Sequence, residues 1–558
     1  MRVTHSHPYG SITKIVSPNT GILLTKNGDY FAAFPHPQSR YQGWFVHVND
    51  TLIKIIDTIH LSSEEPREVQ NLFSHINRVH TDITETFFLP DSHTLLYAIS
   101  EKRTIQFSFD IRPAYSSPDV GRTHIHYHDK NTYVLEYRYQ NEQPLFIALY
   151  ADSTEYIPID KWEEVYYPLD EQRQSYPSKR YVYNGIALTA KRVCIGIGFT
   201  RDEAVQKALS GFSAPPQKTN QNNIEQISIP SSISNTEITM AYYAAQQTLY
   251  DLLVTDIKKT GLYAGLPWFF QFWARDELIS LPEFSPEIQT RILEKYVRDM
   301  PHVTSLASSD ELGWLFLRTY EHARKENVFH LPFFFLDPYA QNGVSITWMD
   351  SLPERNGRRI ETMALALAMY KNAYRVTKDL VYKKREEELK RYVRNTLWNG
   401  LVLQDGVDDA TIRPNIFMAA YIYPDLLNKD EWLRCFDTAL AALWLPWGGL
   451  TTIDKHDHRF VRTHTGENPV SYHNGDSWFF LNNMAALVMH RLDAHMFRTY
   501  IDAIVSASAN EILWHGIVGR PAEISSAESL RSEGCWMQAW SAALYMELIN
   551  ELTCTAIG

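Results

Sequence analysis

The segments IETMALALAMY (360–370) and VYKKREEELKRYV (381–393) decide how the C-terminal part of the chain folds. The first is apolar nearly all round, so a helix built from it must be buried on most of its sides. The second is amphipathic, with one face suited to water. SWFFLNNMAALVM (477–489) and WMQAWSAALYMEL (536–548) repeat the first kind, and KDEWLRCFDTALAAL (429–443) repeats the second. Such alternation is expected when inner and outer helices are wound into a double ring.

In the first 200 or so residues, the apolar side chains recur with a different period. Short alternating runs are separated by turn residues, as in TIQFSFDI (104–111), TYVLEYRY (132–139) and RVCIGIGF (192–199), which is typical of an antiparallel sandwich. The polar stretch SAPPQKTNQNN (213–223) cannot pack a core and indicates a linker. We therefore expect an N-terminal antiparallel β-sandwich over residues 1–225 and a helical domain over residues 226–558, whose first helix is capped by Asn235.

Composition excludes several classes of protein. With 53 basic against 65 acidic residues, the chain lacks the basic excess of a nucleic-acid-binding protein. There is no run of about 18 apolar residues to predict a membrane segment, and the opening MRVTHSHPYGSITK lacks the apolar stretch of a signal peptide. The four cysteines are far apart and form no CxxC pair, which favours a reducing, cytoplasmic setting.

One histidine cluster raises the question of a metal. His124, His126 and His128 lie on one face of a predicted strand, which is metal-ligand geometry in principle. Because no nearby Cys or Glu completes a ligand set, a solvated strand face is the better interpretation. GxGxxG, GxSxG, Walker and HExxH motifs are absent. We expect neither a metal nor another cofactor.

A polar and aromatic cluster precedes each candidate inner helix. In a ring of parallel inner helices, all these clusters meet at one end and line one pocket. For any single cluster, a helix cap followed by a turn is the simpler interpretation. However, such a cluster stands at the same place before every candidate inner helix. They are FWARDE (272–277), SSDELGW (308–314), TWMD through RRIE (347–361), DDATIRPN (408–415), SYHNGDSW (471–478) and AEISSAESLRSEGCW (522–536).

At these loops the sequence resembles the glucosidase domain of glycogen debranching enzymes, the amylo-α-1,6-glucosidase family, a relative of the glucoamylases. The resemblance is carried, in order, by PWFFQFWARDELISL (267–281), TWMD (347–350), IRPN (412–415), SYHNGDSW (471–478) and GCWMQAWS (534–541). It implies a C-terminal (α/α)6 barrel. NGDYFAAFPHPQSRYQGWFV (27–46) resembles the start of the β-sandwich that precedes this barrel in archaeal and bacterial members.

The resemblance also implies the catalytic pair. Hydrolysis of a glycosidic bond needs a proton for the leaving oxygen and, in an inverting enzyme, a second carboxylate that activates water. By resemblance, Asp350 of TWMD is the general acid and Glu523 of PAEIS is the general base. The aromatic and apolar residues before Asp350 favour a pKa raised by desolvation. Because SSAESLRSEG after Glu523 departs from the family's pattern, Glu528 and Glu533 compete with it for the role of base.

Further residues are expected to hold the sugar. Arg275 and Asp276 suit bidentate hydrogen bonds to hydroxyls, with a structural ion pair or helix cap as the alternative. Glu361 opens an apolar helix, either as an N-terminal charge or as a site residue. His473 either bonds a hydroxyl or is a satisfied buried histidine.

Aromatic side chains and two polar ones complete the expected site. Stacking faces for pyranose rings are expected among Trp268, Trp273, Trp348, Trp478 and Trp540, although core packing is the commoner role of any single Trp. The resemblance adds Asp310, which stands with Trp314 at the family's D-x-x-x-W spacing, and Gln538 of QAWS.

These residues together predict an exo-acting, inverting α-glucosidase that binds an oligo- or polysaccharide and releases glucose from α-1,6-linked stubs of glycogen-like or dextrin substrates. The sequence between 326 and 346 is short for the family. This leaves open a related (α/α)6 glycosidase acting on isomaltose, trehalose or a glucosylated metabolite. A non-catalytic glycan-binding relative is a third reading, against which the retained Asp350 and Glu523 argue.

Overall fold

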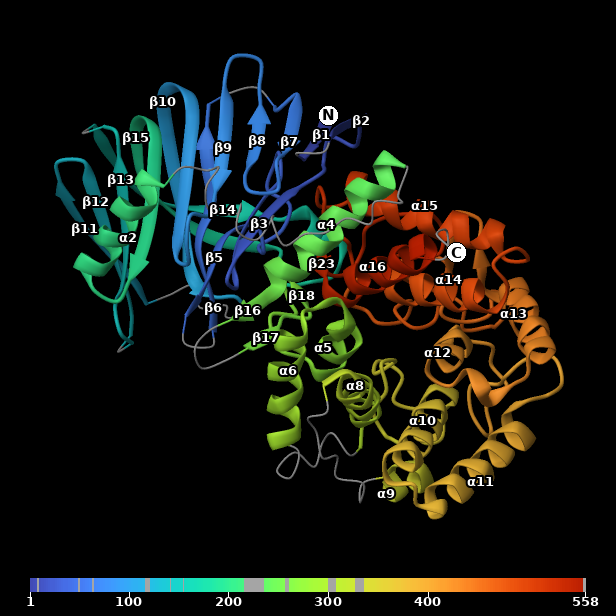
Figure 1. Cartoon of the computed structure of the whole chain (residues 1–558). Coiled ribbons are helices and arrows are strands. Elements are labelled where there is room, and N and C mark those ends of the chain that lie inside the picture. The colour runs from blue at the N-terminus through green and yellow to red at the C-terminus, as the bar shows by residue number, and fades with distance from the viewer. Residues whose placement is uncertain are drawn as a thin grey trace. The chain divides into compact units, whose positions relative to one another are not determined.

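The computed structural model describes residues 1–7, 10–48, 51–62, 65–115, 121–140, 142–153, 155–214, 235–255, 260–299, 308–326 and 336–554 (Figure 1). Contacts divide the chain into two compact units. The first comprises Met1–Ile229, Asn235–Leu253 and Ile512–Arg520, and the second comprises Pro230–Ser234, Val254–Glu511 and Pro521–Gly558. The linker expected at 213–223 lies, from residue 215 onward, outside the described residues. The domain boundary between 225 and 226 stays a prediction.

The first unit is built on one large, branched sheet. Its order is β11-β12-β13-β15-β10-β9-β8-β7-β1-β2, with β14 paired to β15 and the run from β3 to β6 joined through β10. Neighbouring strands are antiparallel, except that β1 pairs with β7 in parallel. Its strands are β1 (Arg2–His7), β2 (Gly10–Ile15), β3 (Ile22–Lys26), β4 (Asp29–Ala33), β5 (Gly43–Val48), β6 (Thr51–Leu61), β7 (Glu68–Asn71), β8 (Ile76–Val79), β9 (Thr84–Phe88), β10 (Thr94–Pro113), β11 (Arg122–Asp129), β12 (Thr132–Tyr139), β13 (Leu145–Ala151), β14 (Tyr156–Tyr166) and β15 (Lys179–Gly198).

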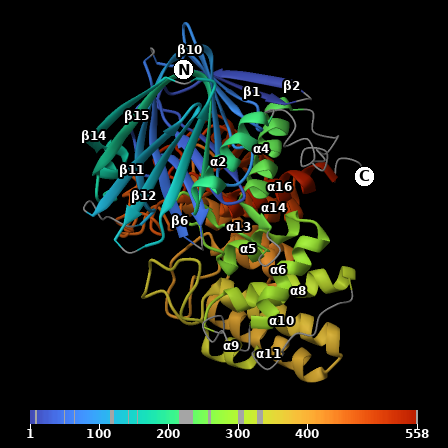
Figure 2. The same ribbon diagram turned by 90° about the vertical axis from the view of Figure 1, so that its left-hand side faces the viewer.

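The two longest strands, β10 and β15, hold the sheet together. They pair with each other, and their register shifts at Ala98/Arg103 and again at Phe107/Ser108. On its other edge β10 pairs first with β9 and farther along with β6. Because bulges bend and twist a strand, the pair of β10 and β15 can belong to two layers of the sheet. Figure 2 shows β15 in the same part of the molecule as β11, β12 and β14.

Short helices cover parts of this unit. They are α1 (Pro168–Gln172), α2 (Arg201–Ser213) and α4 (Thr236–Leu252). α2 packs on β13 and β15, and Gly196 allows the close approach, since a Cβ there would lie 2.5 Å from the backbone of Ala204. Asn235 caps α4 as predicted, because its side chain accepts from the N–H groups of Glu237 and Ile238.

The second unit contains a closed ring of helices. α5 packs on α8, α8 on α10, α10 on α12, α12 on α14, α14 on α16, and α16 returns to α5. The buried helices expected from the apolar segments, α10, α14 and α16, belong to this ring. Its helices are α5 (Ala274–Ser280), α8 (Glu311–Glu326), α10 (Ile360–Thr377), α12 (Asn415–Ile422), α14 (Phe479–Asp493) and α16 (Ala539–Cys554).

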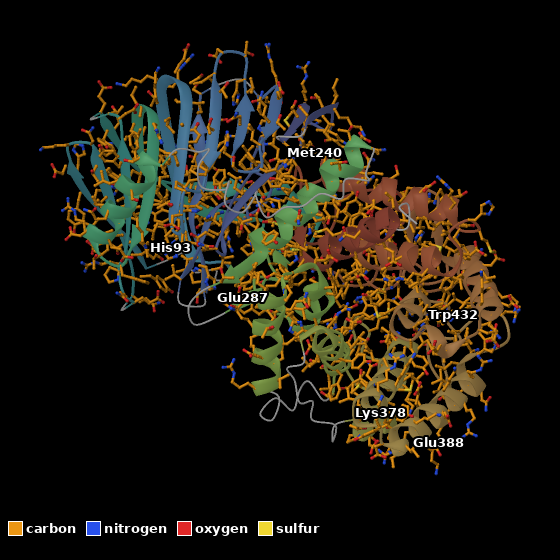
Figure 3. The ribbon with its side chains drawn as sticks, viewed as in Figure 1. His93, Met240, Glu287, Lys378, Glu388 and Trp432 are labelled. Carbon is orange, nitrogen blue, oxygen red and sulfur yellow. The ribbon has the colours of Figure 1, made fainter. Side chains whose placement is uncertain are left out.

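The remaining helices of this unit, among them the amphipathic α11 and α13, pack outside the ring. Figure 3 shows Glu388 on the outer helix α11, where it is exposed, and Trp432 on α13, which is buried and donates its indole N–H to the carbonyl of Pro424 at 2.7 Å. The helices outside the ring are α6 (Pro286–Asp299), α9 (Leu336–Asn342), α11 (Leu380–Leu397), α13 (Lys429–Leu443) and α15 (Arg498–Trp514), with the 3₁₀ turns η1 (Leu281–Glu283) and η4 (Pro424–Leu426).

Short strand pairs fasten the loops at the ring. β18 (Gly265–Leu266) pairs with β23 (Met537–Gln538), and β21 (Ser477–Trp478) pairs with β22 (Ile524–Ser525). Two further pairs are β16 (Leu253–Thr255) with β17 (Thr260–Leu262) and β19 (Trp444–Leu445) with β20 (Gly449–Leu450). Each of the first two pairs joins loops that are far apart in the sequence. None of the described helices is long and apolar enough to span a membrane.

Candidate active site

A small cavity of about 60 Å³ lies within the second unit, where the loops before the inner helices meet. Four of the six predicted clusters, FWARDE, TWMD, SYHNGDSW and AEIS, contribute to its wall. SSDELGW and DDATIRPN contribute no lining residue, so the prediction that all six clusters line one pocket is only partly met. The lining residues are Ala264, Phe269, Trp273, Arg275, Asp276, Trp348, Asp350, Tyr472, Trp478, Glu523, Gln538 and Trp540.

Glu523 is held from several directions. It is 2% exposed, and its main chain is fixed by the β21–β22 pairing and by a bond from its N–H to the carbonyl of Cys535 at 3.0 Å. The Tyr472 hydroxyl donates to Oε1, and the N–H of Cys535 donates to Oε2 at 2.9 Å. Hydrogen bonds to a carboxylate favour its charged form. The carboxylate of Glu523 is therefore held in one orientation by two donors.

Gly534 makes this arrangement possible. Its φ is +67°, and a Cβ there would lie 2.4 Å from Oε2 of Glu523. Positive φ is accessible to glycine without steric cost, and the missing side chain leaves room for the carboxylate. The turn at Gly534 thus brings the N–H of Cys535 onto Glu523.

Asp350 is exposed and lines the same cavity. Its loop is fixed at neighbouring positions: the Trp348 indole donates to Asn415 at 2.8 Å, and Ser351 Oγ bonds His473 Nδ1 at 2.6 Å. Desolvation by its surroundings raises the pKa of Asp350; Arg275 opposes this rise and the Asp310 carboxylate adds to it. A carboxyl group with a raised pKa keeps its proton to a higher pH, as a general acid requires.

Arg275 and Asp276 stand at the start of α5 and have different partners. Arg275 is 4% exposed and binds Asp310 through Nε at 2.9 Å and Nη2 at 2.7 Å. Asp276 accepts from Nε2 of Gln538 at 3.0 Å across the β18–β23 connection. Burial, opposed by Arg275 and reinforced by Glu523, raises the pKa of Asp276 to about 8. Asp276 is therefore largely protonated at neutral pH, so it can donate to a hydroxyl as well as accept from one.

Stacked aromatic rings form the floor. Trp478 lies edge-on to Trp348 at 5.3 Å and to Trp540 at 5.8 Å, and it stacks on His473 with ring centroids 5.2 Å apart. Burial, followed by repulsion from nearby arginines, lowers the pKa of His473 well below its ordinary value. His473 is thus a neutral ring that stacks behind Trp478. Trp273, 42% exposed, stands at the rim.

A buried charge network supports the TWMD loop from behind. Arg355 donates to Glu361 at 2.6 and 2.9 Å and to Asp405 at 2.6 and 2.7 Å, and it also reaches Thr347 at 3.0 Å. Glu361 is fully buried and satisfied by Arg355 rather than directed into the cavity. It positions the loop.

The expected site residues thus divide into two groups. Nine of them line the cavity, namely Trp273, Arg275, Asp276, Trp348, Asp350, Trp478, Glu523, Gln538 and Trp540. Four lie outside the lining: Trp268 packs edge-on against Trp536 at 6.1 Å, and Asp310, Glu361 and His473 stand behind lining residues as described. Glu528, which is exposed and lies 4.0 Å from Arg462, and Glu533 are also outside it.

Some lining residues were not predicted from the sequence. Tyr472 is the immediate neighbour of His473 in SYHNG, and Phe269 follows Trp268 in PWFF, so both motifs were found but the neighbouring residue was chosen. Ala264 carries no chemical signal. Which of two adjacent side chains faces the cavity depends on the backbone conformation of each loop. The motif alone does not give that conformation.

No metal ligand set accompanies the cavity in the described part of the chain, where no group of three or more His, Cys, Asp or Glu is arranged to hold an ion. Around the histidine-rich strand, His124 stacks on Tyr183 at 4.1 Å and His128 lies edge-on to Tyr156 at 4.5 Å. These rings pack on tyrosines.

The chain is similar to several known proteins. Residues 336–547 match the family model described as amylo-alpha-1,6-glucosidase. A bacterial glucoamylase complexed with acarbose aligns with a TM-score of 0.59 and 13% identity, covering 96% of this chain and 92% of that chain. A glycosidase variant in complex with glucose aligns with a TM-score of 0.43 and 12% identity, over 57% of this chain and 99% of that one. A search of curated proteins found no match.

The family match covers the helical unit from α9 to within α16, and the glucoamylase alignment extends over nearly the whole chain. The predicted resemblance is therefore confirmed. The predicted fold, an N-terminal β-sandwich followed by a C-terminal (α/α)6 barrel, is confirmed as well.

Proposed function

We propose that this glycoside hydrolase of the amylo-α-1,6-glucosidase and glucoamylase type is an exo-acting, inverting α-glucosidase that releases glucose from α-1,6-linked branch stubs of glycogen-like or dextrin substrates. One observation carries the proposal. Asp350, an acid with a raised pKa, and Glu523, a carboxylate fixed by two donors, line one cavity. The match to the amylo-alpha-1,6-glucosidase family model supports a carbohydrate substrate, and its linkage is the point to test.

In this mechanism Asp350 gives its proton to the glycosidic oxygen as the bond to C1 breaks. Glu523 takes a proton from a water molecule, whose oxygen forms the new bond to C1 from the opposite face. Tyr472 and the N–H of Cys535 hold the base ionised and oriented until that moment. The products are glucose of inverted configuration and the shortened glucan.

The lining of the cavity supports binding of a neutral sugar. Protonated Asp276, Gln538 and Arg275 offer fixed polar groups for hydroxyls, while tryptophans offer apolar faces. A terminal glucose unit, inserted end first beside Trp273, fits these features best.

A released-sugar assay on panose, isomaltose, trehalose and limit dextrin tests the substrate. Glucose from panose and limit dextrin is expected, and activity on trehalose alone would overturn the debranching specificity. Proton NMR of the first product tests the stereochemistry: β-glucose from an α-glucoside indicates inversion, and α-glucose indicates retention.

The assignment of the base is tested by three variants. Glu523→Gln and Asp350→Asn should each lose about 10²–10⁴-fold in kcat, the usual contribution of general acid–base catalysis. Glu528→Gln, a matched change at an exposed glutamate of the same loop, should retain activity. Full activity of Glu523→Gln with loss in Glu528→Gln would transfer the role to Glu528.

The small cavity also favours a second candidate, a glycosidase of the same fold acting on a short glucoside such as isomaltose, trehalose or a glucosylated metabolite. A higher kcat/KM for isomaltose than for limit dextrin would select it.

For the location in the cell, we propose the cytoplasm, since Cys194, Cys435 and Cys535 are buried free thiols.

A further inference from the structure

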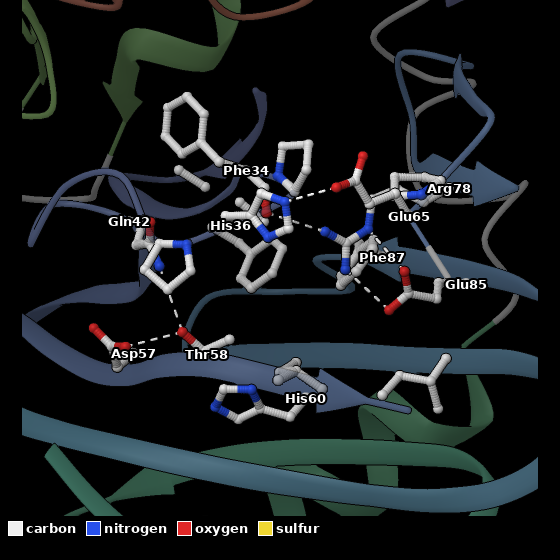
Figure 4. A pocket seen from close by; sticks show the side chains of 18 of the residues that line it. Phe34, His36, Gln42, Asp57, Thr58, His60, Glu65, Arg78, Glu85 and Phe87 are labelled. Atoms are coloured by element: carbon white, nitrogen blue, oxygen red, sulfur yellow. Dashed lines mark hydrogen bonds and ion pairs between the residues drawn. The ribbon is translucent and has the colours of Figure 1, made fainter. Parts of the chain in front are cut away.

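A second cavity, of about 260 Å³, lies wholly within the first unit. We call it the sandwich pocket and show it in Figure 4. Its floor is apolar, because Phe31 and Phe87, stacked at 4.9 Å, are buried there. Its polar wall comes from β6, β8 and β9, and its mouth from the segment after β4 and from Glu65 and Pro66. The catalytic proposal uses none of these residues.

One wall of the sandwich pocket is a preorganised polar network. Arg78 binds Glu85 through Nε at 2.8 Å and Nη2 at 2.9 Å, while His80 contacts the same carboxylate at 2.7 Å. The Tyr97 hydroxyl donates to Glu85 at 2.7 Å as well. Burial opposes ionisation of Glu85, but Arg78 and His80 outweigh it and lower the pKa to about 2. The network therefore stays charged and fixed at neutral pH.

Arg78 in this wall can still donate hydrogen bonds to a ligand. A guanidinium has five N–H donors, and Glu85 occupies Nε and part of Nη2 of Arg78. Among the described residues, the bond given for Nη1 is a long one to the Phe34 carbonyl, at 3.5 Å, which is the limit of a hydrogen bond. Figure 4 shows Arg78 extending toward Phe34 and His36. A hydroxyl in the pocket would offer Nη1 a better acceptor.

The opposite wall and the mouth add further hydrogen-bonding groups. Thr58 donates to Asp57 at 2.9 Å and accepts a long bond of 3.4 Å from Gln42. His60 is exposed and bonds Ser108 at 3.0 Å, and His36 pairs with Glu65 at 2.8 Å with both side chains more than half exposed. These groups can both donate and accept.

The charge of the lining selects a class of ligand. Its only Lys or Arg side chain is Arg78, against three acids, Asp57, Glu65 and Glu85. This balance disfavours a phosphate or another anion. Buried aromatic rings beside fixed polar groups instead suit a neutral, polyhydroxylated molecule. At about 30 Å³ per water molecule, about 260 Å³ holds roughly eight or nine waters, which is space for one sugar ring.

We propose that the sandwich pocket is a second saccharide site, which binds one glucose unit, either as the free sugar or at the end of a glucan chain. The choice of glucose rests on the proposed function, since the catalytic cavity is expected to take the same unit. Such a site would hold a polymeric substrate on the chain between catalytic events.

Binding is measured best on the full chain carrying Asp350→Asn, so that ligand is not consumed. Isothermal titration calorimetry with maltotriose is expected to report two sites per chain. In the same background, His36→Ala with His60→Ala removes two exposed side chains of the pocket and should abolish one site or weaken it at least tenfold. His128→Ala, an exposed histidine of the same unit outside the pocket, is the matched control and should leave both sites.

Further ligands and one further variant decide the remaining questions. Glucose and glycogen, titrated separately, distinguish the free sugar from a chain end, and inorganic phosphate tests the excluded anion. Thr58→Val keeps the shape of the wall, removes one hydroxyl, and should weaken the second site severalfold.

Unchanged stoichiometry and affinity in the double histidine variant would overturn the proposal, and so would binding of phosphate without sugar. A failure of the proposed function is seen separately, as the absence of hydrolysis by the unmodified chain, because titration does not depend on turnover.

Discussion

Tyr472→Phe is the most direct probe of the proposed base. The change deletes a single oxygen, the one that donates to Oε1 of Glu523, and leaves the N–H of Cys535 on Oε2. Burial, reinforced by Glu523, raises the pKa of Tyr472 well above its ordinary value, so the hydroxyl is a neutral donor throughout the working range. The phenyl ring of the variant can keep its packing against Trp478 at 4.7 Å.

The size of the effect follows from the charge on the acceptor. A hydrogen bond to a charged group contributes about 1.5–3 kcal/mol, and about 1.4 kcal/mol equals one pH unit. Loss of a donor that stabilises the carboxylate raises the pH at which the base takes up its proton by about one to two units. The acidic limb of the profile of kcat/KM should therefore move upward by that amount, and its basic limb should stay in place.

The assay is the initial rate of glucose release between pH 4 and pH 9. Tyr370→Phe is the matched control, because Tyr370 also donates to a carboxylate, Asp337, at 2.8 Å but lies outside the cavity lining. The control should lose some stability and keep its pH profile. If the acidic limb of Tyr472→Phe coincided with that of the unmodified chain, Glu523 would not be the base, or Tyr472 would not tune it.

Three further outcomes are expected. Asp350→Asn should reduce kcat about 10²–10⁴-fold without changing the melting temperature by more than a few degrees; a variant with full activity would remove Asp350 as the acid. Gly534→Ala, whose Cβ would stand 2.4 Å from Glu523 at a φ of +67°, should lose at least about tenfold in kcat/KM, as expected for a displaced catalytic group. Gly357→Ala is the control, because Gly357 has a φ of +80° but no atom lies within 4 Å of the added Cβ. It should lower the free energy of unfolding by about 1–3 kcal/mol and leave activity unchanged. Equal loss of activity in Gly534→Ala and Gly357→Ala would refute the role of Gly534. Burial, reinforced by Glu547, raises the pKa of Glu283 from 4.5 to about 8, so its contribution to stability is full below about pH 4.5 and is lost progressively as the pH rises through about 8. In urea unfolding, Glu283→Gln should therefore match the unmodified chain at pH 4 and exceed its stability at pH 9. Equal stability of the two chains at pH 9 would contradict the raised pKa.

Periodicity was enough to predict the main architecture. A helix such as Ile360–Thr377, apolar on all sides, is stable only when other helices surround it, so its place in the inner ring follows from composition. The alternating strands of the N-terminal part follow from the two-residue period of a sheet in the same way. The bend and register shifts of β10 and β15 could not be predicted, because they depend on which strands pair.

Residue chemistry predicted part of the site. The phase of the loops, together with the resemblance, placed Asp350, Glu523, Arg275 and Gln538 at one end of the ring, and they do line one cavity. Glu361 was expected in the site, yet its carboxylate turns to Arg355 behind the TWMD loop. A buried glutamate needs a partner, and the sequence does not reveal whether that partner is a sugar or an arginine five or six positions away.

The sequence by itself determined the two kinds of packing, the sandwich and the double ring, because hydrophobic period is a local property that each segment carries. It also determined which loops hold acids and tryptophans. Only the tertiary structure decided that Tyr472 rather than His473 meets Glu523, and that Gly534 brings the N–H of Cys535 onto the same carboxylate. The physical reason is distance along the chain. Tyr472 is 51 positions from Glu523, so their contact is fixed by the strand pair β21–β22 and not by any local preference of either residue.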